Sequence, residues 1–286
     1  MKKIIYFIEF IIICFLFFVF KVLGYKLSSN LGFFIGKTFG PLFRSKKLVI
    51  ENLKKSNIQL KKNYNDSANE IFGNYGRIFA EYPFIKNFRK GNLERYIEID
   101  GKKYLDEIKS KNKKVVFISG HFNNFELMAM EIEKSGVDLS AIYRPLNNIF
   151  LNKIMENIRT NYICQKQIKK GRSGTREIIE NLKKGSSIAL MIDQRVREGV
   201  KVKFFGNLAT TTTIPAQLVK KYKCELVPIY IERRSKFHFK MYVSKPIKVG
   251  ENKTVDEITE FLNTVLEKMI LKNPLQWIWT HDRWKK

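Results

Sequence analysis

The chain has 286 residues, a hydrophobic fraction of 44% and a formal net charge of +26. This length and apolar content allow one large or two small domains with a buried core, which excludes a wholly disordered chain. The three cysteines, Cys14, Cys164 and Cys224, are widely spaced and form no C-x-x-C pair, so neither a disulfide framework nor a thiolate zinc site is expected. The positive charge predicts an anionic partner: nucleic acid, acidic lipid head groups or an acidic protein.

The N-terminus carries an apolar run over residues 4–20, interrupted only by Glu9 and preceded by Lys2 and Lys3. At about 1.5 Å per residue, this run just reaches across a bilayer core of about 30 Å, and apolar residues after Lys21 extend it. No small-x-small cleavage pattern follows, so we predict an uncleaved, single-pass membrane anchor over residues 1–25. A buried core helix fits less well, because nearly every face is apolar. The lysines on the two sides slightly favour a cytoplasmic body.

A basic segment follows the anchor, with seven Lys and Arg residues between Arg44 and Lys62 and one acid, Glu51. It either lies on anionic lipid or forms a solvated helix face. Ser67-x-x-Glu70 resembles a capping box, and the apolar spacing after it predicts an amphipathic helix that ends at Pro83.

Short apolar runs separated by helical patterns make up the rest of the chain. Strands are predicted at 115–119, 139–143, 188–192 and 226–231, and a half-buried strand at 237–243 with His238 on its solvent side. Helices are predicted from Asn123 or Asn124 to about Lys134, before Gly185, and from the Thr254-x-x-Glu257 capping box to Asn273-Pro274. This alternation predicts an α/β fold, a mostly parallel sheet flanked by helices, in one domain over residues 26–286.

His121 directly follows the strand at 115–119, where ligands bind in open α/β sheets. Glu126 is five residues further on, which is about 140° around a regular helix, so the two side chains meet only if His121 lies in the turn. Glu126 would then hold one imidazole nitrogen, while the other nitrogen takes a proton from an acceptor hydroxyl. The alternative is a histidine that only caps or packs at the start of the helix.

Other catalytic patterns are missing from the sequence. It contains no G-x-S-x-G elbow, no reactive cysteine beside a histidine and no glycine-rich phosphate loop, so covalent serine or cysteine catalysis and nucleotide use have no support. Three scattered histidines and the lack of paired carboxylates at ligand spacing predict that no metal is needed.

Several motifs of the sequence resemble those of a known family. His121-x4-Glu126 matches the H-x4-D/E signature of the glycerolipid acyltransferase superfamily, and GHFNNFEL resembles the lipid A biosynthesis late acyltransferases, the lauroyl/myristoyl acyltransferases of Gram-negative bacteria. Further matches follow in order and cover about residues 115 to 286: Tyr143-Arg144-Pro145-Leu146, Arg172-Ser173-Gly174, Asp193-Gln194, Phe204-Phe205-Gly206 with Ala209-Thr210, and Trp277-x-Trp279-x-His281-x-Arg283-Trp284-Lys285.

The resemblance implies an acyltransferase at the cytoplasmic face of the bacterial inner membrane. It would move a fatty acyl chain from acyl carrier protein, or from acyl-CoA, to a hydroxyl of a lipid A precursor, with no cofactor and no covalent enzyme intermediate. His121 would be the base and Glu126 its partner. The expected partners are acyl carrier protein, an anionic lipid acceptor and inner-membrane lipids. A different glycerolipid or glycolipid acceptor and a non-catalytic lipid-binding protein are the alternatives.

The candidate substrate-binding residues are Asn124, Arg144, Arg172, Ser173, Asp193 and Gln194. Arg144 either binds a phosphate or carboxylate or forms a structural ion pair. Asp193 and Gln194 close a strand and either reach the same site or cap a helix. Backbone amides after Gly120 are candidates for steadying the thioester oxyanion.

Two further segments allow two interpretations each. The basic residues between Lys166 and Arg176 form a surface for the donor or head group, or a solvated charge run. The three C-terminal tryptophans form a membrane-interface belt or a packing motif. No recognised nucleic-acid-binding motif accompanies the basic charge, so we predict no nucleic-acid partner. The Lys-, Ile- and Asn-rich composition departs from the better-known members, so acceptor and chain length do not carry over.

Overall fold

The fold is taken from a computed structural model, which describes residues 2–285 except the side chain of Arg172. The α-helices are α1 (Lys2–Phe43), α2 (Lys46–Lys55), α3 (Tyr64–Glu81), α4 (Ile85–Arg89), α5 (Lys102–Ser110), α6 (Glu126–Lys134), α7 (Ile149–Ile158), α8 (Arg172–Lys183), α9 (Ile214–Tyr222) and α10 (Val255–Lys272). The strands are β1 (Ile97–Asp100), β2 (Val115–Ser119), β3 (Leu139–Tyr143), β4 (Lys166–Lys169), β5 (Ser187–Met191), β6 (Val200–Phe204), β7 (Asn207–Thr211), β8 (Glu225–Ser235) and β9 (His238–Val243). Short helical turns are η1 (Tyr82–Phe84), η2 (Glu94–Tyr96), η3 (Arg159–Ile163, a π-helix) and η4 (Pro274–Gln276).

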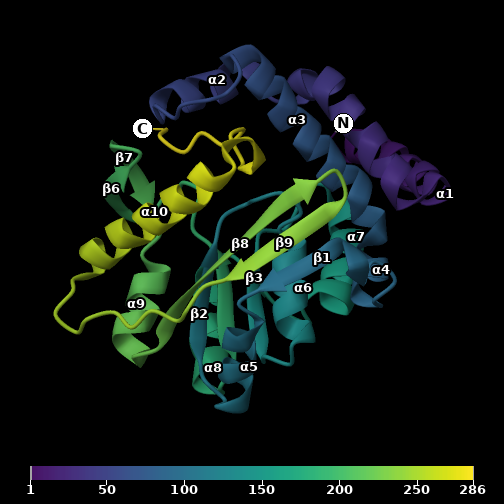
Figure 1. Cartoon of the computed structure of the whole chain (residues 1–286). Coiled ribbons are helices and arrows are strands. Elements are labelled where there is room, and N and C mark those ends of the chain that lie inside the picture. Colours follow the sequence, from purple (N-terminus) through teal and green to yellow (C-terminus); the bar gives the residue numbers. More distant parts are fainter. Residues whose placement is uncertain (1, 286) are drawn as a thin grey trace.

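A seven-stranded sheet in the order β1-β9-β8-β2-β5-β3-β4 forms the centre of the domain (Figure 1). Strands β8, β2, β5, β3 and β4 are parallel to their neighbours, and β9 returns antiparallel to β8 with β1 at the edge. Helix α6 packs on β3 and β8, α8 packs on β3, β4 and β5, and α9 packs on β2 and β8. The predicted α/β fold with a mostly parallel sheet is confirmed.

The central strands are buried on both faces, which explains why the sequence reveals them. All five residues of β2 are buried, and such strands read as continuous apolar runs. The predictions at 115–119 and 139–143 match β2 and β3, and the prediction at 188–192 is one residue away from β5. The predicted alternation in β9 is confirmed, with His238 exposed. Edge strand β4 has one buried residue among four and gives no strand signal, whereas β6 alternates Val200, Val202 and Phe204 with lysines and was missed.

Two predicted helix starts are wrong. α3 begins at Tyr64 with Asn63 as its N-cap, and Ser67 is buried inside the helix. α6 begins without a side-chain cap, because the side chains of Asn123 and Asn124 bind elsewhere, to Gln276 and Glu81. The Thr254–Glu257 capping box at the start of α10 is confirmed.

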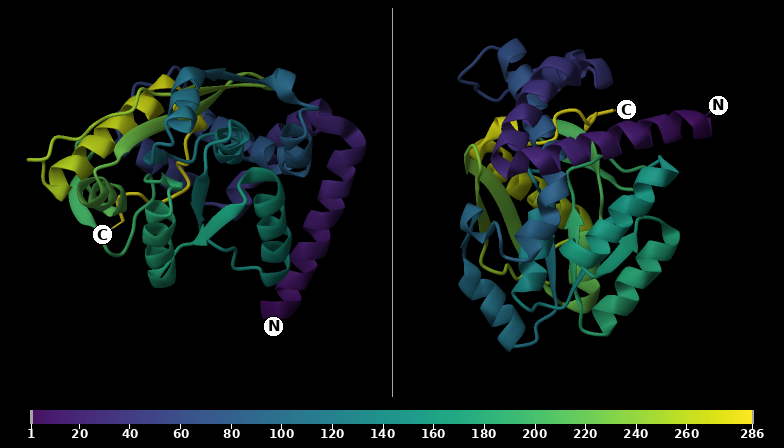
Figure 2. Two further views of the ribbon diagram at one scale, coloured as in Figure 1. Left: turned by 90° about the horizontal axis from the view of Figure 1, so that it is seen from below. Right: turned by 90° about the vertical axis from the view of Figure 1, so that its right-hand side faces the viewer.

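The N-terminal helix α1 consists of two segments joined at Gly24, whose φ of 75° and ψ of 167° interrupt the helix. The second segment packs backbone to backbone on α3: a Cβ added at Gly76 would lie 1.9 Å from the Gly32 carbonyl oxygen. The first segment runs beside α7 (Figure 2). Only glycine permits the close approach of α1 to α3, which fixes the second segment to the domain.

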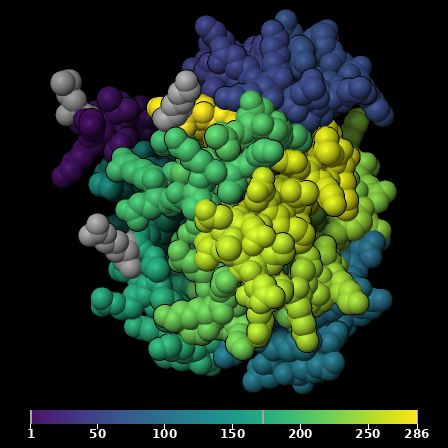
Figure 3. All heavy atoms as spheres, turned by 90° about the vertical axis from the view of Figure 1, so that its left-hand side faces the viewer, coloured from purple at the N-terminus to yellow at the C-terminus, as the bar shows by residue number. Residues whose placement is uncertain are grey.

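The C-terminal segment closes the domain on the side of α2 and α10. Asn52 of α2 donates hydrogen bonds of 2.9 Å to the carbonyl oxygens of both Trp279 and His281. Seen from this side, α10 covers the middle of the face, with residues of α2 above it (Figure 3). The end of the chain is therefore positioned near the carboxyl ends of the central strands.

Candidate active site

His121 lies at the carboxyl end of β2, in the turn that leads to α6. Gly120 precedes it, and a Cβ there would lie 3.1 Å from Oδ2 of Asp193 and 2.9 Å from Leu266. Asn123 in the same turn has a φ of 44°, a left-handed conformation that asparagine tolerates better than most residues. The turn therefore needs Gly120, where the backbone passes close to Asp193, and Asn123, whose left-handed conformation reverses the direction of the chain.

The imidazole of His121 is bound to Asp193, which follows the neighbouring strand β5. Nδ1 of His121 lies 2.8 Å from Oδ1 of Asp193, and the backbone N–H of His121 donates to Oδ2 at 2.6 Å. Trp277 donates its indole N–H to the same Oδ2 at 2.9 Å. In the sheet, Ser119 pairs with Met191, so His121 and Asp193 each lie two residues beyond a paired position and meet.

Asp193 is fully buried. Burial by itself raises the pKa of its carboxyl, but the charge and hydrogen bonds of His121 and the Trp277 N–H outweigh it, and the pKa is lowered. An ionised Asp193 accepts the Nδ1 proton of neutral His121 and leaves Nε2 free to accept another. The imidazole side chain is 21% exposed, so a substrate hydroxyl can reach it. The pair has the geometry of a general base with its orienting carboxylate.

Glu126, the predicted partner of His121, binds Arg159 instead. Oε1 of Glu126 accepts hydrogen bonds from Nε and Nη2 of Arg159 at 2.9 and 2.6 Å. Burial lowers the pKa of Arg159, but the adjacent Glu126 outweighs it and the pKa is raised. The predicted contact between Glu126 and a ring nitrogen differs from the structure, because α6 begins only at Glu126 and directs this side chain toward the π-helix after α7.

The backbone amides after Gly120 are already engaged, contrary to the prediction that they face an oxyanion. The N–H of His121 donates to Asp193, that of Phe122 to the Gly120 carbonyl at 2.9 Å, and that of Asn123 to the Gln276 carbonyl at 3.0 Å. These three amides hold the turn in shape and are not directed at an oxyanion.

A buried polar network supports the turn from behind. The side chain of Asn123 donates to Oε1 of Gln276, and Asn124 donates to Oε2 of Glu81 at 3.4 Å. Glu81 is fully buried and forms a two-point ion pair with Arg233 at 2.7 and 2.9 Å. Asn124 is also fully buried, so it serves the turn and does not reach a substrate directly.

Arg144 and Lys170 form a second feature of this edge of the sheet. They follow β3 and β4, which are parallel neighbours, and Arg144 is exposed. Burial and the positive charge of Arg144 lower the pKa of Lys170. Other lysines of the predicted basic segment lie in ion pairs, Lys166 with Asp138 and Lys169 with Glu156. Arg144 and Lys170 therefore place positive charge at the same edge of the sheet as His121, where the parallel strands end.

The remaining predicted binding residues are more peripheral. Ser173 is exposed at the start of α8, and Gln194 is half-buried beside Asp193. The Arg172 side chain lies outside the described residues. Asp193, predicted as a binding residue, is the partner of the histidine.

The C-terminal tryptophans are core residues, which decides between the two interpretations in favour of packing. Trp277, Trp279 and Trp284 are at most 5% exposed. Arg283 is fully buried and donates to Thr210 and Thr211, and burial lowers its pKa to about 10. His281 accepts a hydrogen bond at Nε2 from the Arg195 N–H at 2.8 Å, and burial lowers its pKa.

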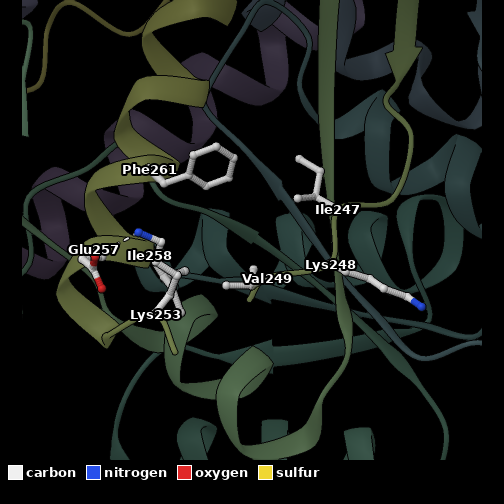
Figure 4. A pocket seen from close by; sticks show the side chains of 7 residues that line it. All are labelled: Ile247, Lys248, Val249, Lys253, Glu257, Ile258 and Phe261. Carbon is white, nitrogen blue, oxygen red and sulfur yellow. Dashed lines mark hydrogen bonds and ion pairs between the residues drawn. The ribbon is translucent and has the colours of Figure 1, made fainter. Parts of the chain in front are cut away.

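Within residues 2–285, no group of His, Cys, Asp and Glu has the arrangement of a metal site. A surface pocket lies elsewhere, between Ile247 and Val249 and the start of α10, lined also by Phe261 (Figure 4). It contains none of the candidate site residues.

Sequence reasoning missed four residues that shape the site: Arg159, Glu81, Arg233 and Gln276. Arg233 follows the predicted strand 226–231 at its carboxyl end, which was a usable signal. Arg159 and Glu81 lie in helical segments that carry no local sign of a site. Gln276 follows Pro274, and its role depends on where the chain end packs.

The chain was compared with known proteins. Residues 1–286 match the family described as bacterial lipid A biosynthesis acyltransferase. Lipid A biosynthesis palmitoleoyltransferase of Escherichia coli (strain K12) is 24% identical over 222 residues, 76% of this chain and 70% of that protein. The lipid A biosynthesis acyltransferase of Shigella flexneri has the same identity and coverage. The lipid A biosynthesis lauroyltransferase of E. coli is 25% identical over 201 residues, 68% of this chain and 63% of that protein. The chain therefore belongs to the bacterial lipid A biosynthesis acyltransferase family and is an acyltransferase.

Proposed function

We propose that this acyltransferase moves a fatty acyl chain from a thioester donor, acyl carrier protein or acyl-CoA, to a hydroxyl of a lipid A precursor at the cytoplasmic face of a bacterial inner membrane. The hydrogen-bonded pair of His121 and Asp193 carries this proposal, because it supplies a base at the ligand-binding edge of the sheet. The names of the relatives support the acceptor class.

The proposed reaction is a direct transfer. Nε2 of His121 takes the proton of the acceptor hydroxyl as its oxygen attacks the thioester carbon. The tetrahedral intermediate then collapses, the C–S bond breaks, and the leaving thiolate takes the proton from the imidazolium. Asp193 stabilises the imidazolium charge between these two steps.

A covalent enzyme intermediate is not part of the proposal. Cys164 is buried, and burial raises its pKa to about 12, so its thiol is a poor nucleophile. Ser119 is buried and donates its hydroxyl hydrogen bond to the Ile229 carbonyl oxygen at 2.6 Å. Both groups are occupied or unreactive, which supports direct attack by the acceptor.

Charge and apolar surface support the membrane setting. Arg144 and Lys170 would bind the phosphate of an anionic lipid acceptor or of the donor. One described helix, α1, is long and apolar enough to cross a membrane, and the basic α2 segment would lie on anionic head groups. No metal or cofactor has a role in this scheme, and activity that survives a chelator is the expected result.

The experiment that tests the proposal uses membranes containing the protein, acyl carrier protein with a labelled acyl chain and a tetra-acylated lipid A precursor. Mass analysis should show the gain of one acyl group. His121→Ala should reduce the rate about 10²–10⁴-fold, the usual contribution of general base catalysis. His238→Ala is the matched control, because His238 is exposed at the start of β9, and it should leave the rate unchanged.

Full activity in His121→Ala would contradict the assigned base. Transfer to a lysophospholipid or glycerol phosphate, with none to the lipid A precursor, would contradict the acceptor and keep the mechanism. Salt-sensitive lipid binding without any transfer would favour a non-catalytic lipid-binding protein.

A further inference from the structure

The first segment of α1 has two different faces. At about 100° per residue, its exposed large apolar side chains fall within one arc of about 160°. These side chains are Ile4, Ile5, Phe7, Ile8, Ile11, Ile12, Phe15, Phe18, Val22 and Leu23. The four charged residues before Gly24, namely Lys2, Lys3, Glu9 and Lys21, all lie outside this arc. The segment therefore exposes one continuous apolar arc, whereas the opposite side carries the four charges together with apolar residues such as Phe10, Phe17 and Phe20.

The opposite face is packed against the domain, beginning near the N-terminus. Asn148, the N-cap of α7, donates to the Tyr6 carbonyl oxygen at 2.8 Å and to Oε2 of Glu9 at 3.0 Å. The ring of Phe150 lies 5.8 Å from that of Phe10, and 5.6 Å from that of Phe7 at the margin of the apolar arc. The start of α7 thus holds the first three turns of α1.

The same face stays in contact with the domain up to the kink. Phe17 packs on Phe79 at 5.2 Å, Phe20 is 2% exposed, and Lys21 donates to Asn87 at 3.3 Å. From Tyr6 to Lys21 the helix rises about 22 Å, which is most of the thickness of a bilayer core of about 30 Å.

A helix that crossed the bilayer would carry this attached surface with it. Glu9, Asn148 and Asn87 would then lie at the depth of the hydrocarbon, where polar and charged groups are costly. A helix lying along the membrane surface avoids this cost, because only the apolar arc enters the acyl chains. The lysines at both ends of the segment would then lie at the level of anionic head groups, which complement their charge.

We propose that residues 2–23 of α1 do not cross the bilayer but lie along one leaflet of an anionic lipid membrane, with the apolar arc in the acyl chains and α7 on the opposite side. The exposed Leu146 and Ile149, next to Asn148, extend the membrane-facing surface to the connection that carries Arg144. An acceptor lipid would therefore approach the site sideways from the leaflet. That the leaflet is the cytoplasmic one rests on the proposed function, whereas the in-plane orientation does not.

Single cysteines test the orientation in a full-length chain in which the three native cysteines are replaced and activity is retained. Lys3→Cys reports the N-terminus, and Lys184→Cys, exposed after α8, reports the domain. Both are treated with a membrane-impermeant maleimide in spheroplasts and in inside-out inner-membrane vesicles. We expect both to react only in inside-out vesicles.

Other outcomes separate the two proposals. Reaction of Lys3→Cys in spheroplasts, with Lys184→Cys protected there, would show a crossing helix and overturn the inference. Reaction of Lys3→Cys only after detergent is added would place residue 3 inside the bilayer and also overturn it. Reaction of both variants in spheroplasts alone would keep the in-plane helix and overturn the cytoplasmic site of the proposed function.

A second measurement compares adjacent positions on opposite faces. Phe18 is 66% exposed in the apolar arc, whereas Phe17 packs on Phe79. In vesicles of brominated anionic lipid, we expect added fluorescence quenching for Phe18→Trp and little for Phe17→Trp, relative to the three buried native tryptophans. Equal quenching at both positions would mean lipid surrounds the helix and would contradict the inference.

Discussion

The two sides of the active site are held in different ways. Asp193, on the side of the sheet, is fully buried and receives three hydrogen bonds from His121 and Trp277. Glu126 and Arg159, on the other side, connect the site to α7, of which none of the described residues is buried. A helix with few buried apolar contacts opens locally at low cost. The proposed base is therefore fixed to the core, whereas α7 has no buried residue among those described to hold it.

The largest effect is expected from breaking the fixed side with Asp193→Asn. The amide keeps the shape but no longer stabilises an imidazolium or holds the tautomer with Nε2 unprotonated. We expect the rate to fall about 10²–10⁴-fold.

Asp138→Asn is the matched control, because Asp138 is an exposed partner of Lys166 that precedes β3, at the end of the parallel strands opposite to His121. It should leave the rate unchanged. A rate for Asp193→Asn close to that of the unchanged protein would contradict the assigned role of Asp193 as the carboxylate that orients His121.

A smaller effect is expected on the side of α7 from Arg159→Met. This change leaves Glu126, whose side chain is 9% exposed, without its cation. Removing one partner of a buried pair costs about 3–5 kcal/mol in the free energy of unfolding, and Arg159→Met with Glu126→Gln should recover part of that loss. Denaturant unfolding measures both variants, with Lys153→Met on the exposed face of α7 as the control.

We also expect Arg159→Met to lower the transfer rate, by about tenfold, because α7 loses its connection to Glu126. This value corresponds to about 1.4 kcal/mol of barrier. No loss of stability and no loss of rate would mean that the Glu126–Arg159 pair does not join α7 to the site.

The smallest effect is expected from Arg144→Ala, which removes a charge from the substrate wall and leaves the base intact. A lost charge-assisted hydrogen bond is worth about 1.5–3 kcal/mol, so KM should rise about tenfold or more while kcat changes little. Lys102→Ala, an exposed lysine before β2, is the control. An unchanged KM for phosphorylated acceptor and for donor would contradict phosphate binding by Arg144.

Sequence patterns predict elements well where burial is uniform or alternates regularly. β2 and β3 read as apolar runs, and β9 alternates, so all three were found. β4 has one buried residue among four, so its sequence has no strand signal. Ser67 matched a capping box, but the helix starts one turn earlier because Asn63 caps it, and Ser67 is buried inside the helix.

The candidate site was partly predictable for a related reason. His121, Arg144 and Asp193 each come just after a predicted strand. Because the carboxyl ends of parallel strands meet at one edge of the sheet, the sequence predicts that these three residues lie at the same edge. The identity of the carboxylate on His121 did not follow, because Glu126 is near in sequence whereas Asp193 is 72 residues away. The short distance in the sequence favoured Glu126 as the partner of the imidazole, whereas the contact is made by Asp193.

Local patterns predict the α/β class, the family and the histidine at the end of a buried strand, because these depend on periodicity and on residues close together in the chain. The contacts of Asp193 with His121, of Arg159 with Glu126 and of α1 with α7 arise from the folded arrangement. Each of these contacts depends on the order in which strands and helices pack. That order brings together side chains whose sequence separation is too large for any local pattern to encode.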